Sequence, residues 1–120
     1  MINFACKDFR SIDIIKCGLG LTRAELSIFL HLLKNKDRTF TTSALSKEVG
    51  LEITTAQKAF KKMTEKKLLT KNQLNLDTGG YLFEYKILPE NKIKQILKDI
   101  IKSWSKRVEK KIDQDNFFKI

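Results

Sequence analysis

Two short helical patterns joined by a tight turn lie between Ser43 and Leu69, and they constrain the fold of the 120-residue chain more than any other feature. Thr42 or Ser43 is the expected N-cap of the first helix, and Gly50 is its expected C-terminal stop. The second helix is expected over about residues 53–66, with alanines, a phenylalanine and a methionine recurring on one face. This spacing predicts a helix-turn-helix.

Further elements surround this unit. Residues 1–17 contain enough apolar side chains for a short helix, and the Gly-Leu-Gly that follows is expected to end it. Thr22 and Glu25 form a capping-box pattern, which predicts an amphipathic helix to about Asn35. Residues 69–88 have the pattern of two strands around an Asp-Thr-Gly-Gly turn, so a β-hairpin is expected there.

A long amphipathic helix is predicted from Glu90, just after the single proline, nearly to the C-terminus. The expected class is mainly α with a small β-hairpin. We expect residues 1–89 to form one domain and residues 90–120 to form an appended helix. The apolar side chains of this helix recur every three or four residues: Ile93, Ile96, Leu97, Ile100, Ile101, Trp104, Val108 and Ile112.

The chain is strongly basic, with 24 Lys and Arg against 14 Asp and Glu and a formal net charge of +10. Such an excess fits a polyanionic partner, because neutralised phosphates release their condensed counterions. A lysine-rich solvated surface explains the same number without any partner. The position of the charges therefore has to decide between the two.

The second helix of the helix-turn-helix carries its lysines and its glutamine away from the apolar face. Lysines can neutralise phosphates, and the Gln57 amide matches the N6 and N7 groups of adenine in the major groove. Any amphipathic helix points lysines outward, so it is the turn before this helix and the hairpin after it that favour DNA binding. The expected DNA contacts are Thr42, Ser43, Thr54, Thr55, Gln57, Lys58, Lys61, Lys62, Lys71 and Asn72.

The hairpin is expected over about residues 69–88, with its tip near the DNA backbone or minor groove. Asp77 lies at this tip, where a cation would suit a minor groove better, so we expect backbone contact at most. A purely structural hairpin that covers the core is an equally good interpretation.

The sequence offers little for catalysis or metal binding. Two cysteines, Cys6 and Cys17, and one histidine, His31, are too few for a zinc site, and no phosphate-binding glycine loop is present. We expect buried thiols, with a redox role left open, a structural or surface histidine, no cofactor and no enzymatic activity. Neither a signal peptide nor an apolar run of about 20 residues is present, so a cytoplasmic protein without membrane contact is expected.

Three stretches resemble the winged helix-turn-helix regulators of the MarR and TrmB type, especially small archaeal ones: LGLTRAELSIFLHLL, TTSALSKEVGLEITTAQKAFKKMTEKKLLTK and GGYLFEYKILP. The resemblance implies a DNA-binding transcriptional regulator whose hairpin is the wing. Two positions depart from the family pattern. Lys67 stands where the family usually has glycine, and Glu52 stands where a small hydroxyl residue is common.

Members of that group commonly dimerise through terminal helices, and the apolar stripe of the last helix exceeds what one small domain needs. We therefore expect a homodimer with recognition helices about 34 Å apart on a palindromic site. The alternative is an intramolecular helix lying over Phe4, Phe9 and Phe29. The expected interface residues are Ile96, Ile100, Trp104 and Val108.

Two other functions remain open at this point. A winged helix can serve as a protein-interaction module of a transcription or assembly complex, which predicts an apolar or acidic outer face on the second helix. A sequence-indifferent coat on nucleic acid fits the charge but gives Gln57 no purpose. A small effector, if there is one, would lie between the domain and the last helix.

Overall fold

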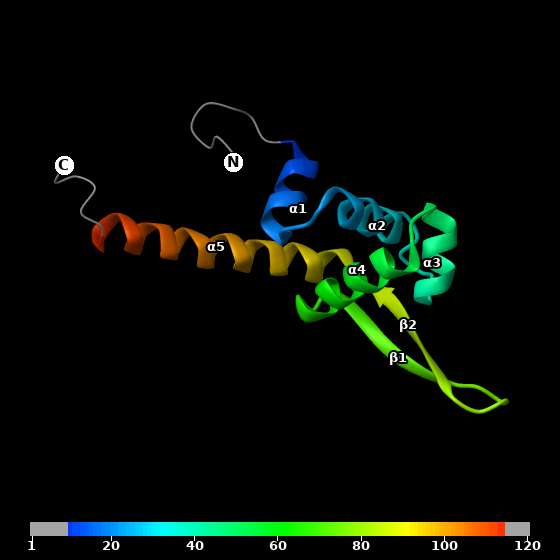
Figure 1. The fold of residues 1–120 in the computed structure, drawn as a ribbon. Coiled ribbons are helices and arrows are strands. Elements are labelled where there is room, and N and C mark those ends of the chain that lie inside the picture. The colour runs from blue at the N-terminus through cyan, green and yellow to red at the C-terminus, as the bar shows by residue number, and fades with distance from the viewer. Residues whose placement is uncertain (1–9, 115–120) are drawn as a thin grey trace.

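The computed structural model describes residues 10–114. These residues form five helices and one antiparallel hairpin, so the expected mainly α class is confirmed (Figure 1). None of the described helices is both long and apolar enough to cross a lipid bilayer. The elements are α1 (Ser11–Leu19), α2 (Arg23–Lys34), α3 (Thr42–Val49), α4 (Ile53–Glu65), β1 (Leu69–Asn75), β2 (Tyr81–Ile87) and α5 (Glu90–Gln114).

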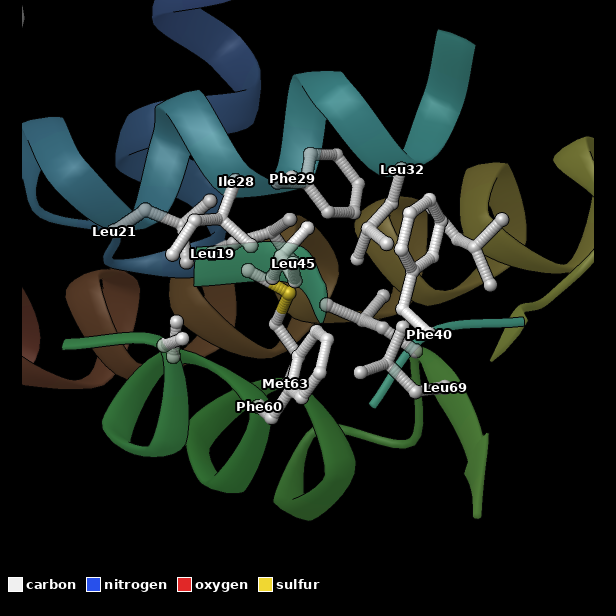
Figure 2. Packing of buried hydrophobic residues seen from close by; sticks show 14 of the residues in the cluster. Leu19, Leu21, Ile28, Phe29, Leu32, Phe40, Leu45, Phe60, Met63 and Leu69 are labelled. Carbon is white, nitrogen blue, oxygen red and sulfur yellow. The ribbon is translucent and has the colours of Figure 1, made fainter. Parts of the chain in front are cut away.

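One hydrophobic core lies between α2, α3, α4 and the base of the hairpin (Figure 2). Phe29 of α2 and Phe60 of α4 are fully buried there, with Leu45 of α3 beside them. The predicted helix near the N-terminus is present as α1, which passes through Gly18 and ends at Leu19. The N-terminal phenylalanines expected under the last helix fall outside the described residues.

The helix starts are set by hydroxyl side chains. Thr22 Oγ1 accepts the Glu25 N–H at 3.2 Å and Glu25 Oε1 accepts the Thr22 N–H at 2.8 Å, which confirms the capping box of α2. The N-cap of α3 is Thr41, whose Oγ1 accepts the Ala44 N–H at 3.1 Å. The expectation of a later cap at the next two hydroxyl residues, Thr42 or Ser43, was wrong by one or two positions.

Three helix ends close through a residue in the left-handed region, and at one of them that residue is a lysine. At the end of α4 the Leu68 N–H donates to Met63 O and the Lys67 N–H donates to Thr64 O, both at 2.9 Å. This closure needs a left-handed residue, and Lys67 has φ of 63° where glycine is usual. The corresponding residues after α1 and α3 are Gly20 and Gly50.

The hairpin is fastened to the helices at its base. Leu69 pairs with Ile87 and Asn75 with Tyr81, around a turn that contains two glycines with positive φ. Phe40, in the loop before α3, exchanges both backbone hydrogen bonds with Tyr85 at 2.8 Å. This one-residue third strand was not predicted from the sequence.

Helix α5 begins on the core and then leaves it. Ile93 is buried, and α1 packs across the early part of α5, where a Cβ added at Gly18 would lie 3.3 Å from Leu97 Cδ2. The rest of the 25-residue helix extends away from the domain, which gives the described chain its length of 67 Å against a width of 27 Å (Figure 1).

Candidate nucleic-acid interface

Helix α4 has the two faces that the sequence predicted. Ala56, Ala59, Phe60 and Met63 are fully buried against the core. Lysines and an amide occupy the opposite side, because a step of about 100° per residue separates the two sets. The exposed residues on that side include Gln57, Lys58 and Lys61.

A groove of about 380 Å³ lies between α4 and the hairpin. It brings together four of the predicted contact residues, which come from α3, α4 and β1 although they are up to 29 positions apart: Thr42, Gln57, Lys61 and Lys71. Three further lining residues were not predicted as contacts: Thr64, Glu65 and Tyr85. Glu65 follows Lys61 by four positions, so the helical period alone places both residues on the same face of α4. Tyr85 reaches the groove through the strand register, which the sequence pattern does not give.

Aromatic rings position Lys71 at the edge of this groove. Its Nζ lies 4.0 Å from the centroid of the Phe83 ring and 6.0 Å from that of Tyr85. Tyr85 in turn packs on Phe60 of α4, with ring centroids 4.4 Å apart. Lys71 of the hairpin and Lys61 of α4 therefore line the same groove from its two sides.

Lys62 does not join this group. Its Nζ lies 2.7 Å from Oε1 of Glu25 and 3.1 Å from the carbonyl oxygen of Gly20. Its ammonium is therefore turned toward the start of α2, although the side chain stays 34% exposed. Lys58 and Lys61, by contrast, form no ion pair with any residue in the described range 10–114. Burial of Glu25 favours a raised pKa, but hydrogen bonds from Lys62 and Thr22 outweigh it and lower the pKa of this carboxyl.

The other predicted contacts are scattered around the groove. Ser43 and Thr54 are exposed at the starts of α3 and α4, and Thr55 is half-buried. Asn72 is exposed but pairs with Glu84, so it lies on the side of the hairpin opposite to Lys71. Glu52 is the N-cap of α4 and makes no capping hydrogen bond with its side chain.

Comparison with known proteins identifies the family. Residues 10–108 match the DnaD N-terminal domain. This chain belongs to that family. The sequence also resembled winged-helix regulators of the MarR and TrmB type. The match to the DnaD N-terminal domain does not confirm that subtype.

Several archaeal proteins are similar to this DnaD N-terminal domain. A solved structure from Methanosarcina mazei, described as a possible transcriptional regulator, is 43% identical with a TM-score of 0.83, over 95% of both chains. A Sulfolobus tokodaii structure shares the fold, with a TM-score of 0.63 and 20% identity over 80% of this chain and 92% of that one. An uncharacterised Methanocaldococcus jannaschii protein is 20% identical over 98% of this chain and 87% of its own length.

The fold of this DnaD N-terminal domain is a winged helix, as predicted. The helix α4 follows α3 through a short turn, and the β1–β2 hairpin occupies the place of the wing. Both elements expected from the sequence, at about residues 53–66 and 69–88, are confirmed to within a residue of their ends.

The four predicted interface residues of α5 divide into two pairs. Ile96 and Ile100 are half-buried and pack against the core of their own domain. Trp104 is 44% exposed and Val108 is half-buried, both beyond the part of α5 that packs on the core. The exposed apolar stripe also includes Ile101 and Ile112.

No group of His, Cys, Asp or Glu that could hold a metal ion occurs within the described residues. His31 Nε2 lies 3.3 Å from Glu48 Oε1, and the His31 ring contacts Phe40 edge-on. Arg38 forms two hydrogen bonds with the same Glu48 carboxylate, so the cluster joins α2 to α3. Cys17, expected to be buried, is exposed on α1, and Cys6 lies outside the described residues.

Proposed function

We propose that this DnaD N-terminal domain is a sequence-specific, double-stranded DNA-binding transcriptional regulator that acts as a homodimer. The observation that carries the proposal is the exposed groove between α4 and the hairpin, which gathers Gln57, Lys61 and Lys71 from two elements. The description of the Methanosarcina mazei structure as a possible transcriptional regulator supports the same role.

In this proposal α4 enters the major groove. Gln57 reads adenine through its amide, and Lys58 and Lys61, about 60° apart around the helix, neutralise phosphates beside it. The hairpin follows the backbone, with Lys71 as its phosphate contact. Thr42, Ser43 and the first turn of α4, including Thr54 and Thr55, supply hydroxyl and N–H donors to the phosphates.

Lys62 and Asn72 contribute less to DNA binding in this proposal than their positions in the sequence predict. Lys62 is engaged by Glu25, and Asn72 lies on the other side of the hairpin from Lys71. A protein-interaction module would favour an apolar or acidic outer face on α4, and the exposed Gln57, Lys58 and Lys61 favour DNA instead. The regulator would need no cofactor and would not be an enzyme.

The dimer is proposed to form through α5. Ile101, Trp104 and Ile112 are each more than two-fifths exposed on a helix that extends beyond its own domain. Two such helices packed about a two-fold axis would cover these side chains and hold two α4 helices on one face of a duplex. This is the organisation of the MarR and TrmB type, which we propose as the subtype.

Selection of bound sequences from a random double-stranded DNA pool tests the proposal. The expected result is a palindromic sequence bound at least about 10³-fold more tightly than random DNA at physiological salt. A pool that shows no enrichment after several rounds would contradict sequence-specific binding. Enrichment of a single half-site would contradict the dimer while leaving α4 as the reading element.

A further inference from the structure

The two faces of the hairpin have different chemistry. The register pairs Lys71 with Tyr85, Gln73 with Phe83 and Asn75 with Tyr81, so these six side chains share one face. The other face carries a leucine pair, Leu74 and Leu82. Toward the tip, the first face is thus aromatic and amide and the second is aliphatic, whereas Asn72 and Glu84 follow the leucines on the second face. At the base of the hairpin the first face ends in the buried pair Leu69 and Ile87.

The three aromatic residues form a ladder that runs from the core to the tip. Tyr85 is anchored on Phe60, at a ring distance of 4.4 Å. Phe83 is half-buried, and Tyr81 contacts it at 5.3 Å with the ring planes at 70°. Tyr81 itself is 57% exposed, which is the largest exposure of any bulky apolar or aromatic side chain in the described residues.

The charge on this face is entirely positive. Lys71 is the only ionisable side chain among the strand residues of the aromatic face other than the tyrosines, and Glu84 lies on the leucine face. The face continues into the groove, whose lining adds Lys61 and one carboxylate, that of Glu65. The Lys71 ammonium covers one side of the Phe83 ring at 4.0 Å, so a phosphate that attracts the ammonium would uncover that ring.

We propose that the aromatic face of the hairpin binds single-stranded nucleic acid. Unpaired bases stack on Tyr81 and Phe83, and Lys71 and Lys61 neutralise the phosphates that follow. Aromatic side chains on a sheet beside a positive groove are the common means of holding unpaired bases, and stacking is tolerant of sequence. In a duplex the bases are stacked on one another, so this binding mode is separate from the duplex reading proposed above.

Binding of the full chain to a labelled 12-nucleotide oligothymidylate, followed by fluorescence anisotropy, tests this inference. The matched variants are Tyr81→Ala on the aromatic face and Leu82→Ala on the leucine face, since both side chains are about half exposed and adjacent in β2. An abasic oligonucleotide of equal length measures charge alone. A random-sequence duplex serves as the double-stranded probe.

The wild-type chain is expected to bind oligothymidylate more tightly than the abasic strand. Tyr81→Ala should weaken oligothymidylate binding about tenfold, as expected for the loss of one stacked base, and change duplex binding less than twofold. Leu82→Ala should change neither. Equal losses in both variants, or equal wild-type affinities for the two strands, would overturn the inference.

The same measurements can refute the proposed duplex binding and the single-strand site separately. A chain that binds oligothymidylate through Tyr81 but selects no duplex sequence refutes the proposed function alone. A chain that selects a duplex and does not distinguish bases from abasic sites refutes the single-strand site alone. Equal losses in Tyr81→Ala and Leu82→Ala would show that both substitutions perturb the hairpin as a whole, and would overturn the stacking site.

Discussion

The ammonium of Lys62 lies 2.7 Å from Oε1 of Glu25, and the same oxygen accepts the backbone N–H of Thr22 at 2.8 Å. One carboxylate therefore completes the capping box of α2 and pairs with a cation on α4. The Glu25 side chain is 9% exposed, so the pair is well shielded from solvent on the acid's side. It links α4 to the start of α2.

Removing the cation of this pair should destabilise the domain. Lys62→Met keeps the aliphatic stem but leaves a buried carboxylate without its charge partner, and we expect a loss of about 1–2 kcal/mol because Lys62 is partly solvated. Urea unfolding at pH 7 measures this. Lys61→Met, on the exposed face of the same helix, should change the free energy of unfolding by less than about 0.5 kcal/mol. Equal effects of the two variants would contradict a role for the pair.

The contribution of Glu25 should also depend on pH. Because the pKa of Glu25 is lowered in the folded state, its stabilisation is complete above the ordinary glutamate pKa of about 4.3 and is lost as pH falls through the folded value. The difference in unfolding free energy between the wild type and Glu25→Gln, which retains a capping-box residue, should shrink as pH falls from 7 to 3. A difference that stays constant over this range would contradict the assignment.

The positive φ of Lys67 predicts a stabilising substitution. A residue with a side chain costs about 1 kcal/mol in the left-handed region, and glycine avoids this cost. Glycine also loses more conformational entropy on folding, which offsets part of the gain. Lys67→Gly should therefore raise stability by about 0.5 kcal/mol and the melting temperature by about 2 °C. The preceding position has φ of −83°, so Lys66→Gly should give no such gain. Calorimetry of both variants compares them directly.

Two substitutions on α4 should separate base reading from phosphate contact. Gln57→Ala should relax the preference at one base pair, by about 1–3 kcal/mol of discrimination, and leave binding to random DNA nearly unchanged. Lys61→Ala should weaken every duplex similarly and lower the salt slope of the binding constant by about one. Titrations at several salt concentrations measure both. If neither variant changes binding, α4 is not the reading helix.

The proposed dimer predicts a monomer when a charge replaces an apolar side chain of α5. Trp104→Glu places a carboxylate in the stripe with Ile101 and Ile112, and light scattering should report the mass of one chain at micromolar concentration. Lys106→Glu puts the same group on the opposite side of the helix, at about 160° from Trp104 by the 100° step, and should remain dimeric. A wild-type chain that is itself monomeric at this concentration would contradict the interface.

Features with a local cause were predictable from the sequence. Thr22 and Glu25 are three residues apart, so their capping box needs no knowledge of the remaining chain. The faces of α4 follow from helical period alone, and Gly50 was a clear C-terminal stop. The N-cap of α3 was placed late because three consecutive hydroxyl residues all satisfy the same local rule, and Thr41 is the one that the backbone uses.

Features set by distant contacts were not predictable in this way. Lys62 lies next to the exposed face of α4, and only the fold brings it to Glu25, 37 positions earlier. Phe40 pairs with Tyr85 as a strand of a single residue, which is too short to show the alternation of apolar and polar residues by which a strand is predicted. Tyr85 enters the groove through the hairpin register. Each case depends on which segments become neighbours.

The missing side chain at position 18 has a consequence far from α1. It allows α1 to pack closely against α5 at Leu97, near the point where α5 leaves the domain. Ile112 lies about 22 Å further along the helix, so a tilt of a few degrees at Leu97 becomes a displacement of an ångström or more there. In a two-fold assembly both arms would tilt together. A methyl group at residue 18 would crowd the Leu97 side chain. If α5 tilted to relieve that contact, the distance between the two α4 helices of the proposed dimer would change, although residue 18 touches neither of them.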